Sequence, residues 1–213
     1  MSFVISLTFV VRMALRSVAV HVRLAETPCV QKAGFHVYRL DFGLNTAMPA
    51  RSFDDANVFY RAMRAVAVTK AGRVVFRPTA HRLDQIVSKL TGGKRSFAGI
   101  AAGLPTVILT TTGAKSGKPR TVALLGIPHP DGVAVVASNY GAAKHPGWYH
   151  NLKVDPAATV TIDGDTWDAT ARLATPVERE EIWAKGIEFF PGLTKEQMWA
   201  GDRHIEAFVL KRP

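Results

Sequence analysis

Two amphipathic helices are predicted in the first half of the chain, where apolar residues recur every three to four positions. The first begins at Asn57, a favourable N-cap residue, and runs to about Lys70. The second runs from about Thr79 to Leu90, and Gly92-Gly93 directly after it is typical of a helix end. Both helices are expected to bury one apolar face against the rest of the protein.

Beyond Leu104 the pattern changes to short β-branched and apolar runs separated by turns, which indicates strands. The expected strands are 106–112, 120–127, 133–138, 158–162, 166–174 and 205–210. Tight turns between them exclude a parallel sheet, because parallel neighbours need a long crossover. One helix interrupts the series: Thr175 as N-cap, Pro176 and Glu178 form a helix start, and the helix runs to about Phe190. The fold class is therefore α+β and mainly β, a small barrel or strongly curled sheet with flanking helices.

Residues 1–56 show no sustained period after their apolar start, so we expect an N-terminal extension before a domain that spans 57–213. Arg12, Arg16 and Arg23 interrupt the apolar start, which leaves no run of the ~20 apolar residues that a membrane-spanning helix needs. Two interpretations stay open. Residues 1–47 are either outside the working protein or an arm that lies on a membrane surface.

Composition and charge indicate what kind of protein this is and what kind of partner it binds. The 213 residues are 47% hydrophobic and 21% charged, which is typical of a globular protein and excludes wholesale disorder. The net charge is +10, and residues 1–103 carry all of it, because residues 104–213 contain 12 basic and 12 acidic side chains. This favours an anionic partner for the first half. No nucleic-acid recognition motif accompanies the charge, so we expect no nucleic-acid partner. We expect a cytoplasmic protein. The alternative is a cytoplasmic protein whose basic first half also makes peripheral contact with a membrane.

The segment from Gly113 to Arg120, called the cationic hairpin below, is the first candidate for chemistry. Its glycines are separated by three residues, and Pro119 stands where a Walker A loop has Ser or Thr, so it does not predict a nucleoside triphosphatase. Exposed N–H groups beside Lys115 and Arg120 could bind an anion. A solvated polar turn is the alternative.

The second candidate is the segment from Ser138 to Leu152, where a predicted strand runs directly into polar and aromatic side chains. Trp148, Tyr149 and Asn151 would suit a flat aromatic ligand, with rings to stack on it and an amide for its polar edge. The alternative is that Trp148 and Tyr149 are core anchors. His145 and His150 are five residues apart with no acidic or cysteine partner, so no metal site is predicted. Any chemistry is therefore expected to belong to an organic cofactor.

Three motifs together resemble one family: Leu109 to Thr121, Ala137 to Asn139, and His145 to Leu152. In this order they are similar to the deazaflavin-dependent nitroreductase family of actinobacteria, whose members use reduced coenzyme F420. The resemblance covers about residues 57–211. It implies a split β-barrel like that of flavin reductases and pyridoxamine-phosphate oxidases, and hydride transfer from the reduced deazaflavin.

The resemblance also implies a set of cofactor-binding residues. The phosphodiester and polyglutamate tail would contact Ala114, Lys115, Ser116, Arg120, Thr121 and Val122. The deazaflavin ring and its side chain would lie against Val136, Ala137, Ser138, Asn139, Gly147, Trp148, Tyr149, His150 and Asn151. Of these, Ser138 and Tyr149 are the expected catalytic residues, which would polarise the acceptor or donate a proton.

The acceptor is expected to be quinone-like, an enone or a nitroaromatic compound. Some family members that reduce nitroimidazoles have several tyrosines where this chain has residues 190–196, and here that segment contains none. An apolar cover from Phe189, Phe190, Leu193 and Trp199 would instead favour a quinone or enone. Two alternatives remain: an oxidoreductase of the same fold that binds flavin mononucleotide, and a non-catalytic protein that binds or carries the deazaflavin. The oligomeric state is left open.

Overall fold

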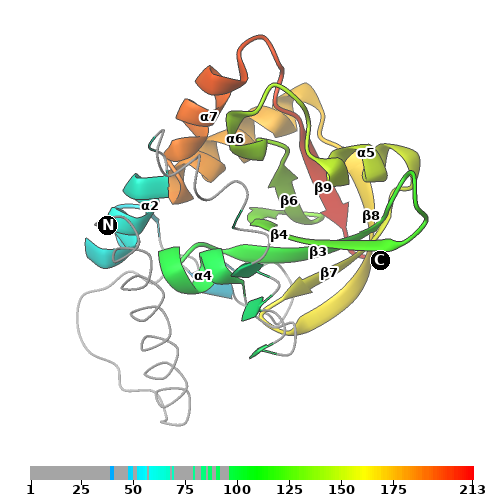
Figure 1. Cartoon of the computed structure of the whole chain (residues 1–213), viewed down its shortest axis with the longest axis horizontal. Coiled ribbons are helices and arrows are strands. Elements are labelled where there is room, and N and C mark those ends of the chain that lie inside the picture. Colours follow the sequence, from blue (N-terminus) through cyan, green and yellow to red (C-terminus); the bar gives the residue numbers. More distant parts are fainter. Residues whose placement is uncertain are drawn as a thin grey trace. The chain divides into compact units, whose positions relative to one another are not determined.

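A computed structural model describes residues 39–40, 48–49, 52–56, 58–67, 69, 79, 83–84, 86–87, 90–91 and 96–213 (Figure 1). All of them belong to one of the two units into which the chain divides, Val37–Pro213. Most of the expected N-terminal extension and the basic residues 82, 89, 94 and 95 therefore lie outside the described residues. From residues 1–51, the structure describes only a two-stranded antiparallel pair, β1 (Arg39–Leu40) with β2 (Met48–Pro49).

Seven antiparallel strands form the main sheet in the order β4-β3-β7-β8-β9-β6-β5 (Figure 1). They are β3 (Thr106–Thr112), β4 (Pro119–Leu125), β5 (Ile127–His129), β6 (Gly132–Val136), β7 (Ala157–Ile162), β8 (Asp165–Leu173) and β9 (Ala207–Lys211). The sheet curls so that β4, at one edge, contacts β6, near the other edge, although the two strands are not hydrogen-bonded. This incomplete closure is the expected split barrel, and the mainly β α+β class is confirmed.

The burial pattern explains why the sheet curls. Strand β8 alternates, with Trp167, Ala169 and Ala171 inside and polar residues outside. Inward residues of β3, β6, β7, β8 and β9 share one apolar cluster with Trp148 and Leu152. Strand β6 is buried on both faces, because its alternate residues Ala134 and Val136 join a second cluster with Ile182. One face of the sheet thus encloses a core, while helices cover the outer face around β6 and β9.

The helices are α2 (Val58–Ala67), α4 (Phe97–Ala102), α5 (Gly147–Val154), α6 (Pro176–Phe189), α7 (Gly192–Ala200) and the short 3-10 turn η1 (Asn139–Gly141). The predicted start of α6 is confirmed: the Thr175 hydroxyl accepts from Glu178 N, and Thr175 N donates to the Glu178 carboxylate. Helix α4 was not predicted. Of the expected 79–90 helix, Thr79, Leu83, Asp84, Ile86, Val87 and Leu90 are helical, and the other residues lie outside the described part.

Residues 52–56, which the sequence places in the extension, contact the body of the unit. Phe53 N donates to the Glu188 carbonyl at 2.8 Å, and Ala56 is buried. The boundary at residue 57 remains a prediction, but the chain is already held to α6 a few residues before it.

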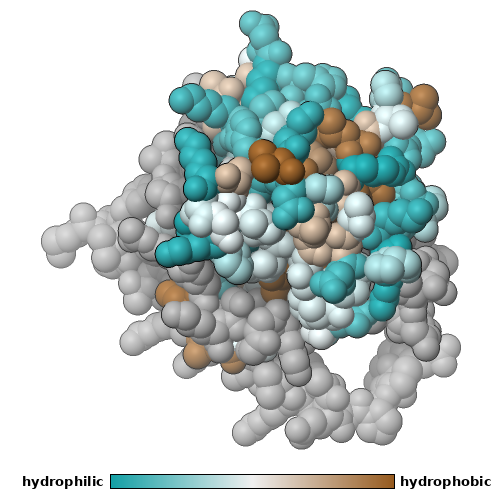
Figure 2. All heavy atoms as spheres, turned by 90° about the vertical axis from the view of Figure 1, so that its right-hand side faces the viewer, coloured by the Kyte–Doolittle hydropathy of each residue, from teal (hydrophilic) through white to brown (hydrophobic). Residues whose placement is uncertain are grey.

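Figure 2 shows the face of the protein that lies on the right-hand side of Figure 1, near the C-terminus. Hydrophilic and weakly hydrophobic side chains cover most of its coloured part, with a small hydrophobic group among them. Elsewhere on the outside of the sheet, threonines pair across strands, as in Thr110 with Thr121 at 2.9 Å and Thr161 with Thr166 at 2.8 Å. Within the described residues, none of the helices has the length and apolar character needed to cross a bilayer.

Candidate active site

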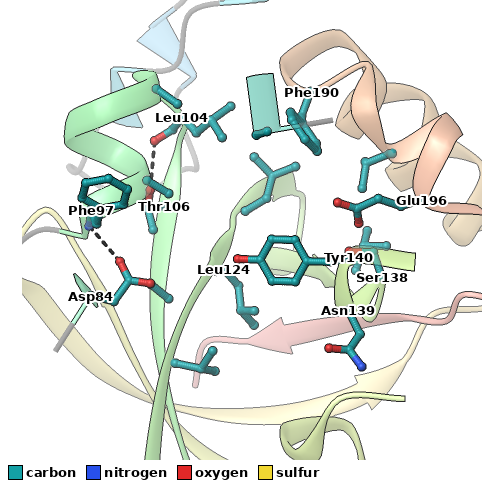
Figure 3. Close-up of a pocket in the computed structure, with 18 of the residues that line it drawn as sticks. Asp84, Phe97, Leu104, Thr106, Leu124, Ser138, Asn139, Tyr140, Phe190 and Glu196 are labelled. Atoms are coloured by element: carbon teal, nitrogen blue, oxygen red, sulfur yellow. Dashed lines mark hydrogen bonds between the residues drawn. The ribbon is translucent and has the colours of Figure 1, made fainter. Parts of the chain in front are cut away.

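A cavity of about 290 Å³ lies between the curled sheet and the helices (Figure 3). Helices α2, α4, α5 and α7, strands β3, β4 and β6, and η1 all contribute to its wall. Most of the lining is apolar, including Met63, Ala101, Leu124, Phe190 and Leu193. Such a space suits an apolar or aromatic molecule with a few polar groups at its edge.

Five of the predicted cofactor-binding residues line this cavity: Val122, Val136, Ser138, Asn139 and Trp148. They come from β4, the end of β6, the residue before η1, η1 itself and α5. Ser138 lies one residue beyond the buried Ala137, where the strand leaves the sheet. Its hydroxyl has no hydrogen-bond partner among the described residues, so it is available to a ligand. The sequence prediction of polar groups at this end of the sheet is therefore correct in position.

The cationic hairpin lies outside the cavity lining and is exposed from Ala114 to Thr121. A tight turn closes it, with Ser116 N and Gly117 N both donating to the Gly113 carbonyl. Gly117 takes a φ of 64°, which favours glycine. No carboxylate of the described residues pairs with Lys115, Lys118 or Arg120. The hairpin therefore presents three unneutralised cations to solvent.

Asn151 connects the hairpin to α5. Its carboxamide oxygen accepts from Ala114 N at 3.0 Å, and its nitrogen donates to the Thr111 hydroxyl at 2.9 Å. The side chain is buried, with 9% exposed. The amide that the sequence assigns to the polar edge of a ligand is thus used inside the protein, where it holds the first residue of the turn.

The remaining predicted residues of α5 are not brought to the cavity. Tyr149 stacks on His145 with ring centroids 4.0 Å apart and meets the edge of Phe208, while Gly147 and His150 are exposed. Trp148, with 6% exposed, belongs to the apolar core and also lines the cavity. Its role as a core residue is confirmed, and its contact with a ligand stays a prediction. The two expected catalytic residues therefore occupy different surroundings: Ser138 lines the cavity and Tyr149 does not. Of the expected apolar cover, Phe190 and Leu193 line it, whereas Phe189 and Trp199 do not.

Arg203 holds the loop that carries Ser138. Its guanidinium donates to the carbonyls of Ala142 at 2.8 Å, Ala137 at 2.9 Å and Ser138 at 2.6 Å. Burial lowers the pKa of Arg203 from its ordinary value. Burial, followed by the nearby Arg203 charge, also lowers the pKa of His145, whose Nδ1 is 3.4 Å from the guanidinium. His145 is therefore suited to accept from Arg203 in its neutral form.

Arg64, on α2, also lines the cavity and is 1% exposed. Its guanidinium donates to Ala102 O at 2.8 Å and Gly103 O at 2.9 Å at the end of α4, and to Phe189 O at 2.9 Å at the end of α6. Burial lowers its pKa to about 10. A cation at two helix C-termini also meets the negative ends of both helix dipoles.

Three side chains of the site were missed from the sequence: Arg64, Arg203 and Tyr140. Tyr140 follows Ser138 and Asn139, and its ring extends from η1 into the cavity (Figure 3). Its position after a predicted strand end was a usable signal. The two arginines gave no signal, because their partners are carbonyl groups of residues far away in the sequence.

The family model for F420H(2)-dependent quinone reductases matches residues 81–212. The chain belongs to this family. The expected F420-dependent family, the oxidoreductase class and coenzyme F420 as the cofactor are thereby confirmed.

Relatives of the family are similar over part of the chain. An F420H(2)-dependent quinone reductase of Mycobacterium tuberculosis is 35% identical over 95 residues, which are 45% of this chain and 63% of that protein. A second protein of that organism, provisionally assigned the same activity, is 32% identical over 117 residues. These residues are 55% of this chain and 98% of the length of that protein. The solved structure of an F420-H2 dependent reductase, FDR-A, shares 41% identity over 50% of this chain and 94% of that chain, with a TM-score of 0.45.

The residues present fit F420, the cofactor of the family. Its tail is a polyanion, and the cationic hairpin offers Lys115, Lys118 and Arg120 without competing carboxylates among the described residues. Its ring is flat and aromatic, and the cavity offers apolar walls with Ser138 and Asn139 among the lining residues. In the described part of the chain, no three His, Cys, Asp or Glu side chains gather as a metal site would require.

Proposed function

We propose that this protein transfers a hydride from reduced F420 to a quinone-like acceptor bound beside the cofactor ring in the cavity. The observation that carries the proposal is the double role of α5. Through Trp148 it forms part of the cavity wall, and through Asn151 it holds Ala114 of the cationic hairpin. One rigid helix thus fixes the distance between a place for a flat ring and a place for an anionic tail.

The hairpin is proposed to bind the tail. Lys115 and Arg120 would make charge-assisted hydrogen bonds to phosphate and carboxylate oxygens, with Ala114, Ser116, Thr121 and Val122 beside them. The Asn151 contact keeps the first residue of the turn in place before the ligand arrives, so less ordering is needed on binding. Asn151 is then a positioning residue for the hairpin.

The cavity is proposed to hold the ring and the acceptor. Val136, Ser138, Asn139 and Trp148 line the part of the wall that the family resemblance assigns to the ring. When bound, the reduced deazaflavin supplies the hydride, so the protein has to orient the two reactants and exclude water. Ser138 offers an unpartnered hydroxyl for a polar edge. Tyr149 lies outside the lining, and we assign it the support of His145 and the core.

A lipophilic quinone suits this wall better than a polar nitroimidazole. Phe190 and Leu193 line the cavity on the side of α7, and residues 190–196 contain no tyrosine, so this part of the wall is apolar. An enone shares the apolar character and has a carbonyl group conjugated to the double bond that accepts the hydride. The quinone is preferred because the family to which the chain belongs is named for it.

The test is anaerobic stopped-flow mixing of the full chain and reduced F420 with a small naphthoquinone or a nitroimidazole. We expect rapid appearance of oxidised F420 with the quinone and a slower reaction with the nitroimidazole. Tight F420 binding without turnover of any acceptor would favour the carrier alternative. A preference for reduced flavin mononucleotide as donor would favour the flavin alternative.

A further inference from the structure

Tyr140 is the aromatic side chain that enters the cavity from η1 (Figure 3). Its ring crosses the space toward Leu124 of β4, and the Glu196 side chain enters the same space from α7. The phenol hydroxyl has no hydrogen-bond partner among the described residues. A hydroxyl that faces a mainly apolar cavity without a protein partner is available to a polar atom of a ligand.

The backbone that directs this ring inward is strained. Asn139 and Tyr140 have φ values of 51° and 53°, and Tyr140 combines this φ with a ψ of 32°. This is the left-handed region, which costs a residue with a side chain about 1 kcal/mol or more. Two such residues in succession persist only where the surroundings impose them. An observed strain of this kind beside a cavity is a reason to look for a function.

Three sets of contacts impose this conformation. Arg203 binds the carbonyls on both sides of the strained pair, those of Ser138 and Ala142. Within the turn, Gly141 N donates to Ser138 O at 3.0 Å and Ala142 N donates to Asn139 O at 3.0 Å. The Asn139 carboxamide donates to Lys144 O at 2.8 Å. The side chain of Tyr140 is thus held in the cavity by main-chain contacts on both of its sides.

Gly141 lets this turn lie directly against α7. A Cβ at this position would be 2.6 Å from Glu196 O, and the residue has a φ of 64°. Because only glycine fits here, η1 can lie in direct contact with α7, and this contact supports the turn that carries Tyr140.

The surroundings keep the phenol protonated. Burial, followed by the charges of Asp84 and Glu196, raises the pKa of Tyr140 to about 12. At neutral pH the side chain is therefore a hydrogen-bond donor and not a base.

We infer that Tyr140 donates a hydrogen bond to the carbonyl oxygen of the acceptor, a role that rests on the function proposed above. When a hydride adds to a quinone, the electron pair places negative charge on a carbonyl oxygen, and the hydroquinone is completed by a proton from water. A donor aimed at that oxygen binds it more strongly as the charge develops, and this lowers the barrier. The phenolic proton stays on Tyr140 throughout. Tyr140 thereby takes the role that the sequence assigned to Tyr149.

The experiment compares Tyr140→Phe with the control Thr161→Val in the full chain. Each variant loses one hydroxyl, but Thr161 lies outside the cavity lining and pairs with Thr166 of the next strand. We expect Tyr140→Phe to lower kcat/KM for the naphthoquinone by about 10- to 100-fold, and Thr161→Val to leave it within about twofold. The Kd for oxidised F420, followed by tryptophan fluorescence, and the Tm should stay near wild type in both.

A second variant keeps the fold and strengthens the donor. A 3-fluorotyrosine at position 140 has a more acidic hydroxyl, so kcat/KM should rise above wild type, an effect that a structural role of the ring would not produce. The inference would be overturned if kcat/KM of Tyr140→Phe equalled that of the wild type, or if fluorination left kcat/KM unchanged. Either result would leave the proposed function intact. Absence of quinone reduction by the wild-type protein would overturn both.

Discussion

The cationic hairpin and the cavity wall use positive charge in opposite ways. Lys115, Lys118 and Arg120 are exposed and have no carboxylate partner among the described residues. Arg64 and Arg203 are wholly or partly buried and donate to main-chain carbonyls. The difference follows from solvation. A guanidinium removed from water must find acceptors inside the protein, whereas an exposed cation keeps its water until an anion replaces it.

The two arginines of the wall differ in what they hold. Arg64 joins the ends of α4 and α6, both regular helices whose last carbonyls have no partner within the helix. Arg203 holds the irregular loop from Ala137 to Ala142. We therefore expect Arg64 to matter most for stability and Arg203 to matter for stability and turnover together. The exposed hairpin should matter for cofactor affinity alone.

The largest effect is expected for Arg64→Met. The substitution leaves the carbonyls of Ala102, Gly103 and Phe189 buried without this donor, and each such loss costs about 1–3 kcal/mol. We expect the free energy of unfolding to fall by roughly 3–5 kcal/mol, measured by urea denaturation. Arg61→Met, an exposed arginine on the same helix, is the control and should change it by less than about 0.5 kcal/mol. Similar losses of unfolding free energy in Arg64→Met and Arg61→Met would show that burial does not make Arg64 more important than an exposed arginine.

Arg203→Lys should have the next largest effect. An ammonium group cannot reach three carbonyls as the planar guanidinium does, so the loop from Ala137 to Ala142 loses part of its support. We expect a loss of roughly 1–2 kcal/mol in unfolding free energy and a clear fall in kcat for quinone reduction. Unchanged turnover together with lower stability would show that the loop geometry is not set by Arg203.

Lys115→Ala and Arg120→Ala should weaken F420 binding without changing stability. Each loses a charge-assisted contact worth about 1–2 kcal/mol of binding free energy, and the loss should shrink at high salt. Lys153→Ala, an exposed lysine on α5, is the control. The effect should be smaller for a cofactor analogue without the phosphate and glutamates. An equal loss for the analogue would mean that these cations do not contact the tail.

The smallest effect concerns a third use of positive charge, a partly exposed ion pair. Arg172 donates to both oxygens of Glu178 and to Asp131, and the Arg172 hydrogen bond holds the pKa of Glu178 far below the ordinary 4.5. Because the folded pKa is the lower one, this stabilisation is present above about pH 4.5 and is lost as the pH falls toward the folded pKa. Glu178→Gln should therefore be less stable than wild type at neutral pH, with the difference shrinking in acid.

Urea denaturation of both proteins at a series of pH values measures this difference. Because both side chains are only partly buried and water screens their attraction, this difference in unfolding free energy should be small beside the losses at the buried arginines. A difference that does not change between neutral and acid pH would mean that the cap at Thr175, and not the ion pair, accounts for it.

Local signals predicted the parts of the molecule whose hydrogen bonds join near neighbours in the sequence. The helix start at Thr175, Pro176 and Glu178 was confirmed in detail, because its partners lie three residues apart. The antiparallel strands followed from tight turns between β-branched runs, and the cationic hairpin from its glycines and charges. Helix α4 was missed, because Phe97–Ala102 is six residues long and has no measurable period.

The sequence by itself thus determined the strands, the α6 helix, the exposed hairpin and, through its three motifs, the family. The tertiary structure decided the rest of the site. Arg64 meets Phe189 across 125 positions of sequence and Arg203 meets Ser138 across 65. Main-chain carbonyls are the same in every residue, so no pattern of side chains reveals which of them a distant guanidinium will bind. Tyr140 lies in the segment that the sequence singled out after a strand end, but its entry into the cavity depends on the turn that Arg203 holds and that packs against α7.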